Sequence, residues 1–270
     1  MLAEYDSQPG RISPPEPELT QEQHDADQED LQAGLSGLAA IVVDASTLDE
    51  SLTQIAEFAV HAIPGADGAG VTAAHPSAMP PRIQSWAVTA EFVRKVDTLQ
   101  YERHGEGPCI TSMHTARPCV SGSISDDTRW PRLGGAMVRL GVNSALSLPL
   151  ILRKQVIGVI NAYAYTLDAF AEHAVAIGTK FAGPAAVTVH NARLLMAAQL
   201  RAEQLHQALD SRSVIDQAVG IIRARSGASA EEAFGRLIKI SQEENVKLHL
   251  VAERLVEISV RRARARHNLS

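Results

Sequence analysis

The stretch SRSVIDQAVGIIRARSGASAEEAFGRLIKISQEENVKLHLVAERLV, residues 211–256, decides the fold of the C-terminal part of the chain. Its apolar side chains recur every three or four residues, which is the spacing of helices that bury one face. The pattern predicts three short amphipathic helices around one core. The side chains expected to face inward are Ile215, Ala218, Val219 and Ile222 in the first helix, Ala230, Ala233, Phe234, Leu237 and Ile240 in the second, and Leu248, Val251, Ala252, Leu255 and Ile258 in the third.

Polar residues mark the joints between these helices. Gly227 follows the first helix and can end it by adopting the left-handed conformation. Ser229 and Glu232 have the S-x-x-E spacing of a capping box, which predicts the start of the second helix. Asn245 is expected to cap the third helix, and Ser241 to contribute to the same joint.

The outer faces of these helices are basic, although the chain as a whole has a net charge of -6. Residues 1–30 hold nine acidic side chains and one arginine, whereas residues 200–270 hold twelve Lys or Arg and nine Asp or Glu. The positive charge therefore belongs to the C-terminal helices, and a small basic unit of this kind usually meets a polyanion or a partner helix.

Three runs here stand in the order and spacing of a known family. They are A-L-x-S-R-x-x-I-x-x-A-x-G at 208–220, A-F-x-x-L at 233–237, and S-Q-x-x-N-x-K-L-x-x-V-A at 241–252. The region resembles an ANTAR domain, and the resemblance implies an RNA-binding module that acts in transcription antitermination. Val219 and Ile238 depart from the family, whose members commonly carry a basic residue at these two positions.

Sequence-specific RNA binding usually targets loops, whose bases stack on aromatic or arginine planes and expose their edges. Phe234, the only aromatic residue after Phe181, is expected in the core, so ring stacking on bases is not expected. Recognition of RNA would then depend on arginines, on amides and on close approach of the RNA to the helix. Small residues allow such an approach, although tight helix packing explains Gly220 equally well. The candidate RNA-binding residues are Arg212, Gln217, Ala218, Gly220, Arg225, Arg236, Lys239 and Lys247. The arginines at 261–266 are expected to add salt-sensitive attraction to RNA or simply to form a solvated end.

The preceding segment alternates helices and strands. Helices are expected at 31–42, 48–63 and 89–99, and strands at 70–74, 82–87, 144–152 and 155–165. The last two strands are separated by Arg153 and Lys154 and form a hairpin. This order predicts an α+β fold, an antiparallel sheet with flanking helices packed to one side.

Several motifs in this segment belong together. They are Gly105-Glu106-Gly107-Pro108-Cys109, Asp127 with Arg129-Trp130-Pro131, Leu148-Pro149-Leu150, and Val156-Ile157-Gly158-Val159-Ile160 leading to Tyr163. The segment resembles a GAF domain of the kind common in actinobacterial sensor proteins. The resemblance implies signal sensing, with a possible small-molecule ligand. No residue set matches a known ligand signature, so the ligand and any cofactor are unknown.

The predicted organisation has four parts: a disordered acidic leader at 1–29, the GAF domain at 30–183, a helical linker or coiled coil at 184–203, and the ANTAR domain with its basic tail at 204–270. Pro184 predicts a kink or break in the helical region. Beyond it, Leu195, Ala198, Ala202, Leu205 and Leu209 repeat at 3-4 spacing. This row predicts a homodimer seam or, equally, a helix that packs on its own domain.

The remaining patterns exclude several classes. No run of about 18 apolar residues is present, which favours a cytoplasmic protein. His104, Cys109, His114 and Cys119 lie five residues apart, wider than the pairs typical of zinc sites, so no metal is expected. No nucleophile stands beside a base, so an enzyme is not expected.

The sequence therefore predicts an RNA-binding antitermination regulator that binds mRNA stem-loops as a dimer, prevents terminator formation and receives a signal through its GAF domain. Two alternatives remain open. One is a sensor or scaffold whose C-terminal helices bind a protein partner, and the other is a DNA-binding helix-turn-helix.

Overall fold

The computed structural model describes residues 4–12, 19–41, 47–75 and 82–267, which divide into two units, Met1–Met196 and Ala197–Ser270. One helix, α6 (Glu172–Ser226), contributes residues to both units. Within the described part of the chain, no helix combines the length and apolarity that crossing a lipid bilayer requires.

The first unit contains a five-stranded antiparallel sheet with the strand order β2-β1-β5-β4-β3. The strands are β1 (Gly68–His75), β2 (Arg82–Val88), β3 (Cys119–Ser121), β4 (Ser144–Leu152) and β5 (Gln155–Ala164). Strands β4 and β5 form the predicted hairpin, and Arg153 and Lys154 reverse the chain with φ angles of 50° and 65°. The antiparallel sheet and its hairpin are therefore confirmed.

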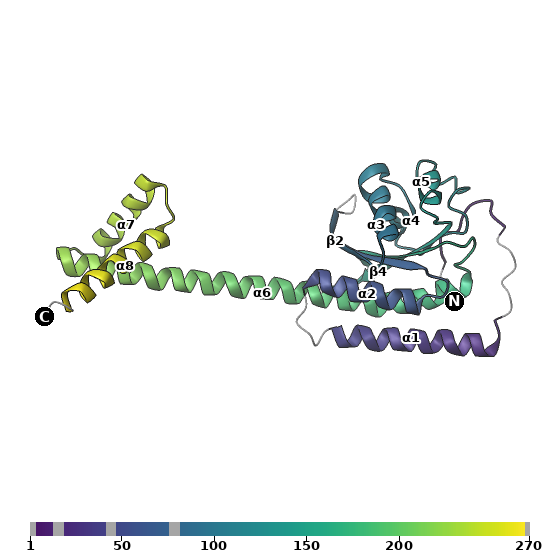
Figure 1. Ribbon diagram of the computed structural model, residues 1–270, viewed down its shortest axis with the longest axis horizontal. Coiled ribbons are helices and arrows are strands. Elements are labelled where there is room, and N and C mark those ends of the chain that lie inside the picture. Colours follow the sequence, from purple (N-terminus) through teal and green to yellow (C-terminus); the bar gives the residue numbers. More distant parts are fainter. Residues whose placement is uncertain (1–3, 13–18, 42–46, 76–81, 268–270) are drawn as a thin grey trace. The chain divides into compact units, whose positions relative to one another are not determined.

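Helices cover both faces of this sheet. They are α1 (Gln21–Ile41), α2 (Leu48–Ala62), α3 (Glu91–Thr98), the π-helical turn η1 (Leu99–His104), α4 (Pro108–Thr115) and α5 (Gly134–Val138). Figure 1 shows α2 on one face, with α1 beyond it, and α3, α4 and α5 on the opposite face. The expectation that helices pack to one side is wrong. Nearly every residue of β4 and β5 is buried, so both faces of the sheet need a cover.

Buried apolar clusters fill the space on the two faces. The cluster on the α2 side joins Leu52 of α2 to Leu148 of β4 and Phe181 of α6. The cluster on the other side includes Trp130 and Met137. Each face of the sheet thus has its own core, and the α3 side carries the cavity described below.

The N-terminal segment corrects the prediction of a disordered leader. Residues 1–3 and 13–18 lie outside the described residues, but residues 4–12, the N-terminal strap, lie along β3. The Asp6 amide donates to the Pro118 carbonyl at 2.8 Å, and the Val120 amide donates to the Asp6 carbonyl at 2.9 Å. Helix α1 then begins at Gln21, inside the range expected to be disordered. Composition alone missed this order because polar partners far along the chain hold the strap.

Helix α6 continues through Pro184, so the predicted break does not occur. Proline removes one helix hydrogen bond, but the neighbouring turn is firmly packed. Ala182, Ala185 and Ala186 are buried in the cluster on the α2 side of the sheet. Burial of these residues offsets the lost bond, as expected for a helix stabilised by packing more than by propensity.

The second unit consists of the C-terminal part of α6 with α7 (Ala230–Glu244) and α8 (Leu248–His267), as Figure 1 shows. Their core is formed by Ala218, Leu237, Val251 and Ala252. Three features of the sequence are confirmed here. Three helical segments form, Gly227 has a left-handed φ of 69°, and Ser229 and Glu232 make both bonds of the capping box, at 2.9 and 3.1 Å.

The joint between α7 and α8 differs from the prediction. Asn245 does not start α8 but ends α7, in the left-handed conformation with a φ of 52°. This conformation is tolerated by asparagine better than by most residues. The Ser241 hydroxyl donates to the Val246 carbonyl at 2.6 Å and so closes the joint, as expected.

Candidate functional site

The predicted RNA-binding side chains of the second unit are exposed, with one exception. Arg212, Gln217, Gly220 and Arg225 lie on α6, Arg236 and Lys239 lie on α7, and Lys247 precedes α8. Among the described residues, Arg212, Arg236 and Lys247 take part in no ion pair. Lys239 contacts Glu243 at 3.8 Å and Arg225 donates to Ser259 at 2.9 Å. Three cations are therefore available to phosphates without breaking an internal bond.

Ala218 is the exception and corrects the prediction. Its side chain is fully buried beside Leu237 and Ala252, so it packs the three helices together and does not face a ligand. Gly220, two residues later, is exposed, and a Cβ added there would meet no atom within 4 Å. Tight packing inside this chain therefore does not explain Gly220.

Phe234 is also placed differently from the prediction. Phe234 is 41% exposed, whereas Ala233 and Leu237 form the buried face of α7. Ile240 and Ile258, predicted to face inward, are exposed as well. Phe234 lies at the edge of the apolar stripe, and a unit of only three helices has too few neighbouring residues to bury it there. An exposed aromatic ring can stack on an unpaired base.

The two positions at which the sequence departs from the ANTAR pattern lie partly inside the unit. Val219 and Ile238 are half-buried, and Val219 packs against the core of the three helices. Apolar residues at these positions add packing area where a basic side chain would add charge. The positive surface of this unit consequently depends on its other cations.

The predicted seam residues share one property in the structure, exposure to solvent. They are Leu195, Ala198, Ala202, Leu205 and Leu209 of α6. Leu205 is 63% exposed and Leu209 is 56% exposed, which is unusual for leucines at coiled-coil spacing. The row thus presents an apolar stripe that a second helix would bury.

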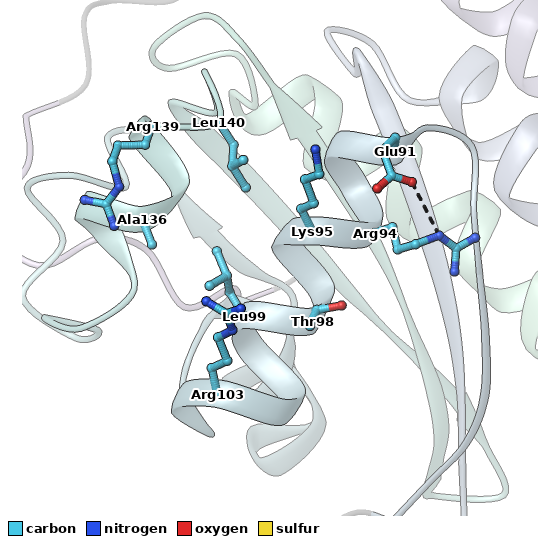
Figure 2. A pocket seen from close by; sticks show the side chains of 9 residues that line it. All are labelled: Glu91, Arg94, Lys95, Thr98, Leu99, Arg103, Ala136, Arg139 and Leu140. Carbon is cyan, nitrogen blue, oxygen red and sulfur yellow. Dashed lines mark ion pairs between the residues drawn. The ribbon is translucent and has the colours of Figure 1, made fainter.

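The first unit contains a pocket of about 440 Å³ between α3, η1 and the residues of α5 and its C-terminal turn. Figure 2 shows its lining, which is Glu91, Arg94, Lys95, Thr98, Leu99, Arg103, Ala136, Arg139 and Leu140. Four of these side chains are cationic and one is a carboxylate. None of these residues was singled out from the sequence, because the cations come from segments that only the fold brings together.

Behind α3, on the side facing the sheet, lies a buried polar network. Tyr163 of β5 donates to the Asp97 Oδ1 atom at 2.6 Å, Asn161 donates to the same atom at 3.3 Å, and Gln100 donates to Tyr163 at 2.7 Å. The Asp97 Oδ2 atom is buried and has no partner among the described residues. Burial raises the pKa of Asp97 to about 7. This carboxyl group therefore changes charge near neutral pH.

The two cysteines are both buried and free. Burial raises the pKa of the Cys109 thiol far above its usual value, and raises that of Cys119 to about 12. Thiols of this kind pack as small apolar groups and are poor nucleophiles. No cluster of three or more His, Cys, Asp or Glu side chains in the described residues is arranged to hold a metal ion.

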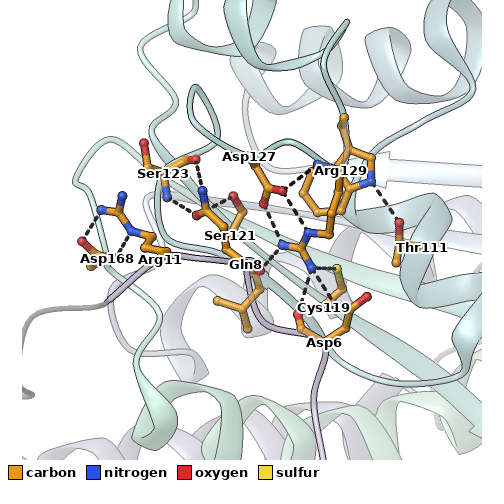
Figure 3. Close-up of polar contacts among 12 residues, drawn as sticks. Asp6, Gln8, Arg11, Thr111, Cys119, Ser121, Ser123, Asp127, Arg129 and Asp168 are labelled. Atoms are coloured by element: carbon orange, nitrogen blue, oxygen red, sulfur yellow. Dashed lines mark hydrogen bonds and ion pairs between the residues drawn. The ribbon is translucent and has the colours of Figure 1, made fainter.

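The D-x-R-W motif is a structural hub, shown in Figure 3. The Arg129 guanidinium donates to Asp127 at 2.9 and 2.7 Å, to Asp6 of the strap at 3.0 Å, and to the Val120 carbonyl at 2.5 Å. It also lies over the Trp130 ring, 4.3 Å from the centroid. Arg129 therefore joins the strap, the edge strand and the loop before α5.

Two further side chains fasten the strap (Figure 3). Gln8 is buried, donates to the Ser123 carbonyl at 3.0 Å and accepts from the Ser123 amide at 3.0 Å. Arg11 donates to both oxygens of Asp168, at 2.7 and 2.5 Å. This bidentate pair keeps the end of the strap beside the loop that precedes α6.

Comparison with known proteins gives two family matches, a GAF domain over residues 45–190 and an ANTAR domain over residues 203–256. No curated protein matches. Among solved structures, the chain is similar to a free methionine-R-sulfoxide reductase from Neisseria meningitidis, with 14% identity, 65% of this chain and 95% of that chain covered, and a TM-score of 0.47. The GAF domain of a phosphoenolpyruvate-protein phosphotransferase from Coxiella burnetii has 16% identity, covers 63% of this chain with 98% of its own length, and gives a TM-score of 0.47.

Both matched domains are regulatory modules, the ANTAR domain for RNA-binding antitermination and the GAF domain for sensing. The GAF match covers more than half of the chain, and the ANTAR match follows it directly on the basic helical unit. The chain therefore belongs to the GAF domain family and has the GAF–ANTAR architecture.

Proposed function

We propose that this protein is a transcription antitermination regulator that binds stem-loops in nascent mRNA as a dimer and prevents a terminator hairpin from forming. The observation that carries the proposal is the ANTAR match at 203–256 on a helical unit whose Arg212, Arg236 and Lys247 are exposed and free of ion pairs. The proposal includes a cytoplasmic location, because the nascent transcripts that it requires are made there.

The proposed RNA surface combines three kinds of contact. Arginine and lysine side chains bind phosphates and base edges, and Gln217 adds an amide. Phe234 offers a ring face to an unstacked loop base. Gly220 leaves open space on α6, so the RNA backbone approaches the helix closely there. Binding by loops fits such a surface better than binding by duplex, whose base edges are less accessible.

The proposed dimer forms along the exposed row from Leu195 to Leu209. Burial of a leucine of this kind stabilises association by roughly 1.5–3 kcal/mol. Two copies joined along α6 would carry two ANTAR domains, which matches a pair of stem-loops on one transcript. The GAF domain supplies the signal input, and the chain has a regulatory and not an enzymatic role.

Binding to short RNA hairpins with hexanucleotide loops, measured at several salt concentrations, tests the proposal. The double variant Arg212→Ala/Arg236→Ala should bind at least about tenfold more weakly, and the salt slope should fall by about 1 for each phosphate that is no longer neutralised. Arg82→Ala/Lys180→Ala is the matched control, since it removes two exposed cations from the first unit. Wild-type affinity in the Arg212/Arg236 variant would overturn the assignment of this surface.

A second candidate function is supported by the exposed apolar residues of the C-terminal helices. Besides Phe234 and Ile240, the side chains of Leu250, Ile258 and Val260 are exposed on α8. Surfaces of this kind bind partner helices. If the protein retains no RNA from a cell lysate and a protein is recovered that the Phe234→Ala variant loses, the partner-binding function replaces the RNA-binding one.

A further inference from the structure

The pocket on the α3 side of the GAF domain has the shape and composition of a ligand site. Its volume of about 440 Å³ lies in the range of pockets that hold small molecules. Thr98, Leu99, Ala136 and Leu140 are half-buried and form its floor. A ligand with an apolar body would cover this half-buried apolar floor, and removing that surface from water would stabilise the complex.

Cations from two parts of the chain, the continuous stretch 91–104 and the turn after α5, line the pocket beside this floor. Arg94 and Lys95 lie on α3, Arg103 lies on η1, and Arg139 follows α5. Figure 2 shows Lys95, Arg103 and Arg139 on different sides of Leu99 and Leu140, and Arg94 beside Glu91 at one end. Glu91 contacts Arg94 at 3.8 Å, whereas Lys95, Arg103 and Arg139 take part in no ion pair among the described residues. Three cations without an ion-pair partner in the described part of the chain therefore line one partly apolar concavity.

We infer that this pocket binds a small organic anion, whose phosphate or carboxylate head meets Lys95, Arg103 and Arg139 and whose apolar body covers Leu99, Ala136 and Leu140. Two observations favour a small molecule over RNA at this place. RNA needs a wide polar surface for its phosphates, whereas four of the nine residues that line this pocket are apolar or uncharged. The Glu91 carboxylate at the rim would repel a polyanion but leaves room for a compact head group.

The inference rests on the proposed role of the GAF domain as the input module, because it names the chemical class of the signal. The location provides a route for that signal. The outer face of α3 lines the pocket, while its inner face carries Val93, Val96 and the buried Asp97, which bonds to Tyr163 on β5. A ligand that draws Lys95 towards α5 therefore acts on a helix that is bonded to the sheet.

Titration calorimetry on the full chain with four probes tests the inference. Octyl phosphate and octanoate have both an anionic head group and an apolar chain. Inorganic phosphate has the anionic group alone, and octyltrimethylammonium has the apolar chain with a cationic head group. Octyl phosphate or octanoate should bind with one site per chain, at least about tenfold more tightly than inorganic phosphate, and octyltrimethylammonium should not bind. The stronger of the first two probes identifies the head group.

Two variants locate the site. Lys95→Gln/Arg139→Gln should weaken octyl phosphate binding by at least about tenfold, since bonds to charged groups dominate the head contact. Ala136→Phe changes no charge and should also abolish binding, because the added ring occupies the floor. Arg82→Gln/Lys180→Gln removes the same charge elsewhere and should leave affinity unchanged. Circular dichroism of each variant verifies that it is folded.

The outcomes separate this inference from the proposed function. Absence of binding by both amphipathic anions, or wild-type affinity in both pocket variants, would overturn the pocket while hairpin binding stays intact. If hairpin affinity falls about tenfold in Lys95→Gln/Arg139→Gln and not in its control, the pocket contacts RNA and the small-molecule inference is wrong. If the probes bind and no hairpin does, the RNA function fails and the pocket stands.

Discussion

Replacing Arg129 with methionine should unfold the GAF domain at a much lower denaturant concentration. The side chain of Asp127 is 0% exposed and that of Arg129 is 14% exposed, so this ion pair is largely shielded from water. Without the Arg129 side chain, the one partner left to the Asp127 carboxylate within the described residues is the backbone amide of residue 129, at 3.1 Å. Removing one partner of a buried pair costs about 3–5 kcal/mol, and the partial exposure of Arg129 places the expected loss near the lower end, about 3 kcal/mol.

Urea unfolding followed by tryptophan fluorescence measures this loss in the full chain. The chain has 2 tryptophans, Trp86 and Trp130, and both lie in the first unit, so the signal reports that unit alone. Because Arg129 lies over the Trp130 ring, its replacement also changes the fluorescence of that tryptophan. The variants are therefore compared by the urea concentration at the unfolding midpoint and not by the amplitude of the fluorescence change.

A double variant and a surface control separate the buried charge from general damage. Asp127→Asn/Arg129→Met also removes the carboxylate that Arg129→Met leaves without its partner. The double variant should therefore lose less free energy of unfolding than the sum of the losses in Asp127→Asn and Arg129→Met. Arg132→Met breaks the pair with Glu106, in which the Arg132 side chain is 63% exposed, and should cost less than the Arg129→Met change, about 1 kcal/mol. A loss below about 0.5 kcal/mol for Arg129→Met would refute the reasoning, because an uncompensated buried carboxylate cannot cost so little.

Three further predictions follow from other sites. Burial raises the pKa of Asp97 from 3.8 to about 7, so the folded state keeps a proton that the unfolded state has lost. The free energy of unfolding should therefore fall by roughly 4 kcal/mol between pH 4 and pH 8 and stay level above, and Asp97→Asn should remove this slope in urea unfolding at several pH values. Gly220→Ala should stabilise α6 by about 0.5–1 kcal/mol in thermal unfolding because the added methyl meets open space, yet weaken hairpin binding if RNA approaches there. Leu205→Glu/Leu209→Glu should leave a folded monomer in light scattering, and a dimer of unchanged stability would exclude this seam.

The parts of the fold that depend on local spacing were predictable from the sequence. The capping box at Ser229, the left-handed Gly227 and the hairpin at Arg153 each rest on residues that are near neighbours in the chain. Helical periodicity likewise identified the core of the second unit around Leu237 and Val251. In these places, local preference and tertiary packing favour the same structure.

The parts that depend on distant residues were not predictable. Composition indicated a disordered leader, but Asp6 is held by Arg129, 123 residues away, and the chain offers no local pattern for such a pair. Periodicity placed Phe234 in the core, although a residue at the edge of an apolar stripe remains exposed when few neighbours cover it. The pocket could not be predicted for the same reason, because Lys95 and Arg139 meet only after folding.

Crosslinking of bound RNA in living cells, followed by sequencing, tests the central claim most directly. The wild-type protein should enrich leader RNAs that contain two adjacent stem-loops before a terminator hairpin, and Arg212→Ala/Arg236→Ala should lose that enrichment. Recovery of the same RNA background with both proteins, with no stem-loop pair enriched, would contradict RNA-binding antitermination as the function of this chain.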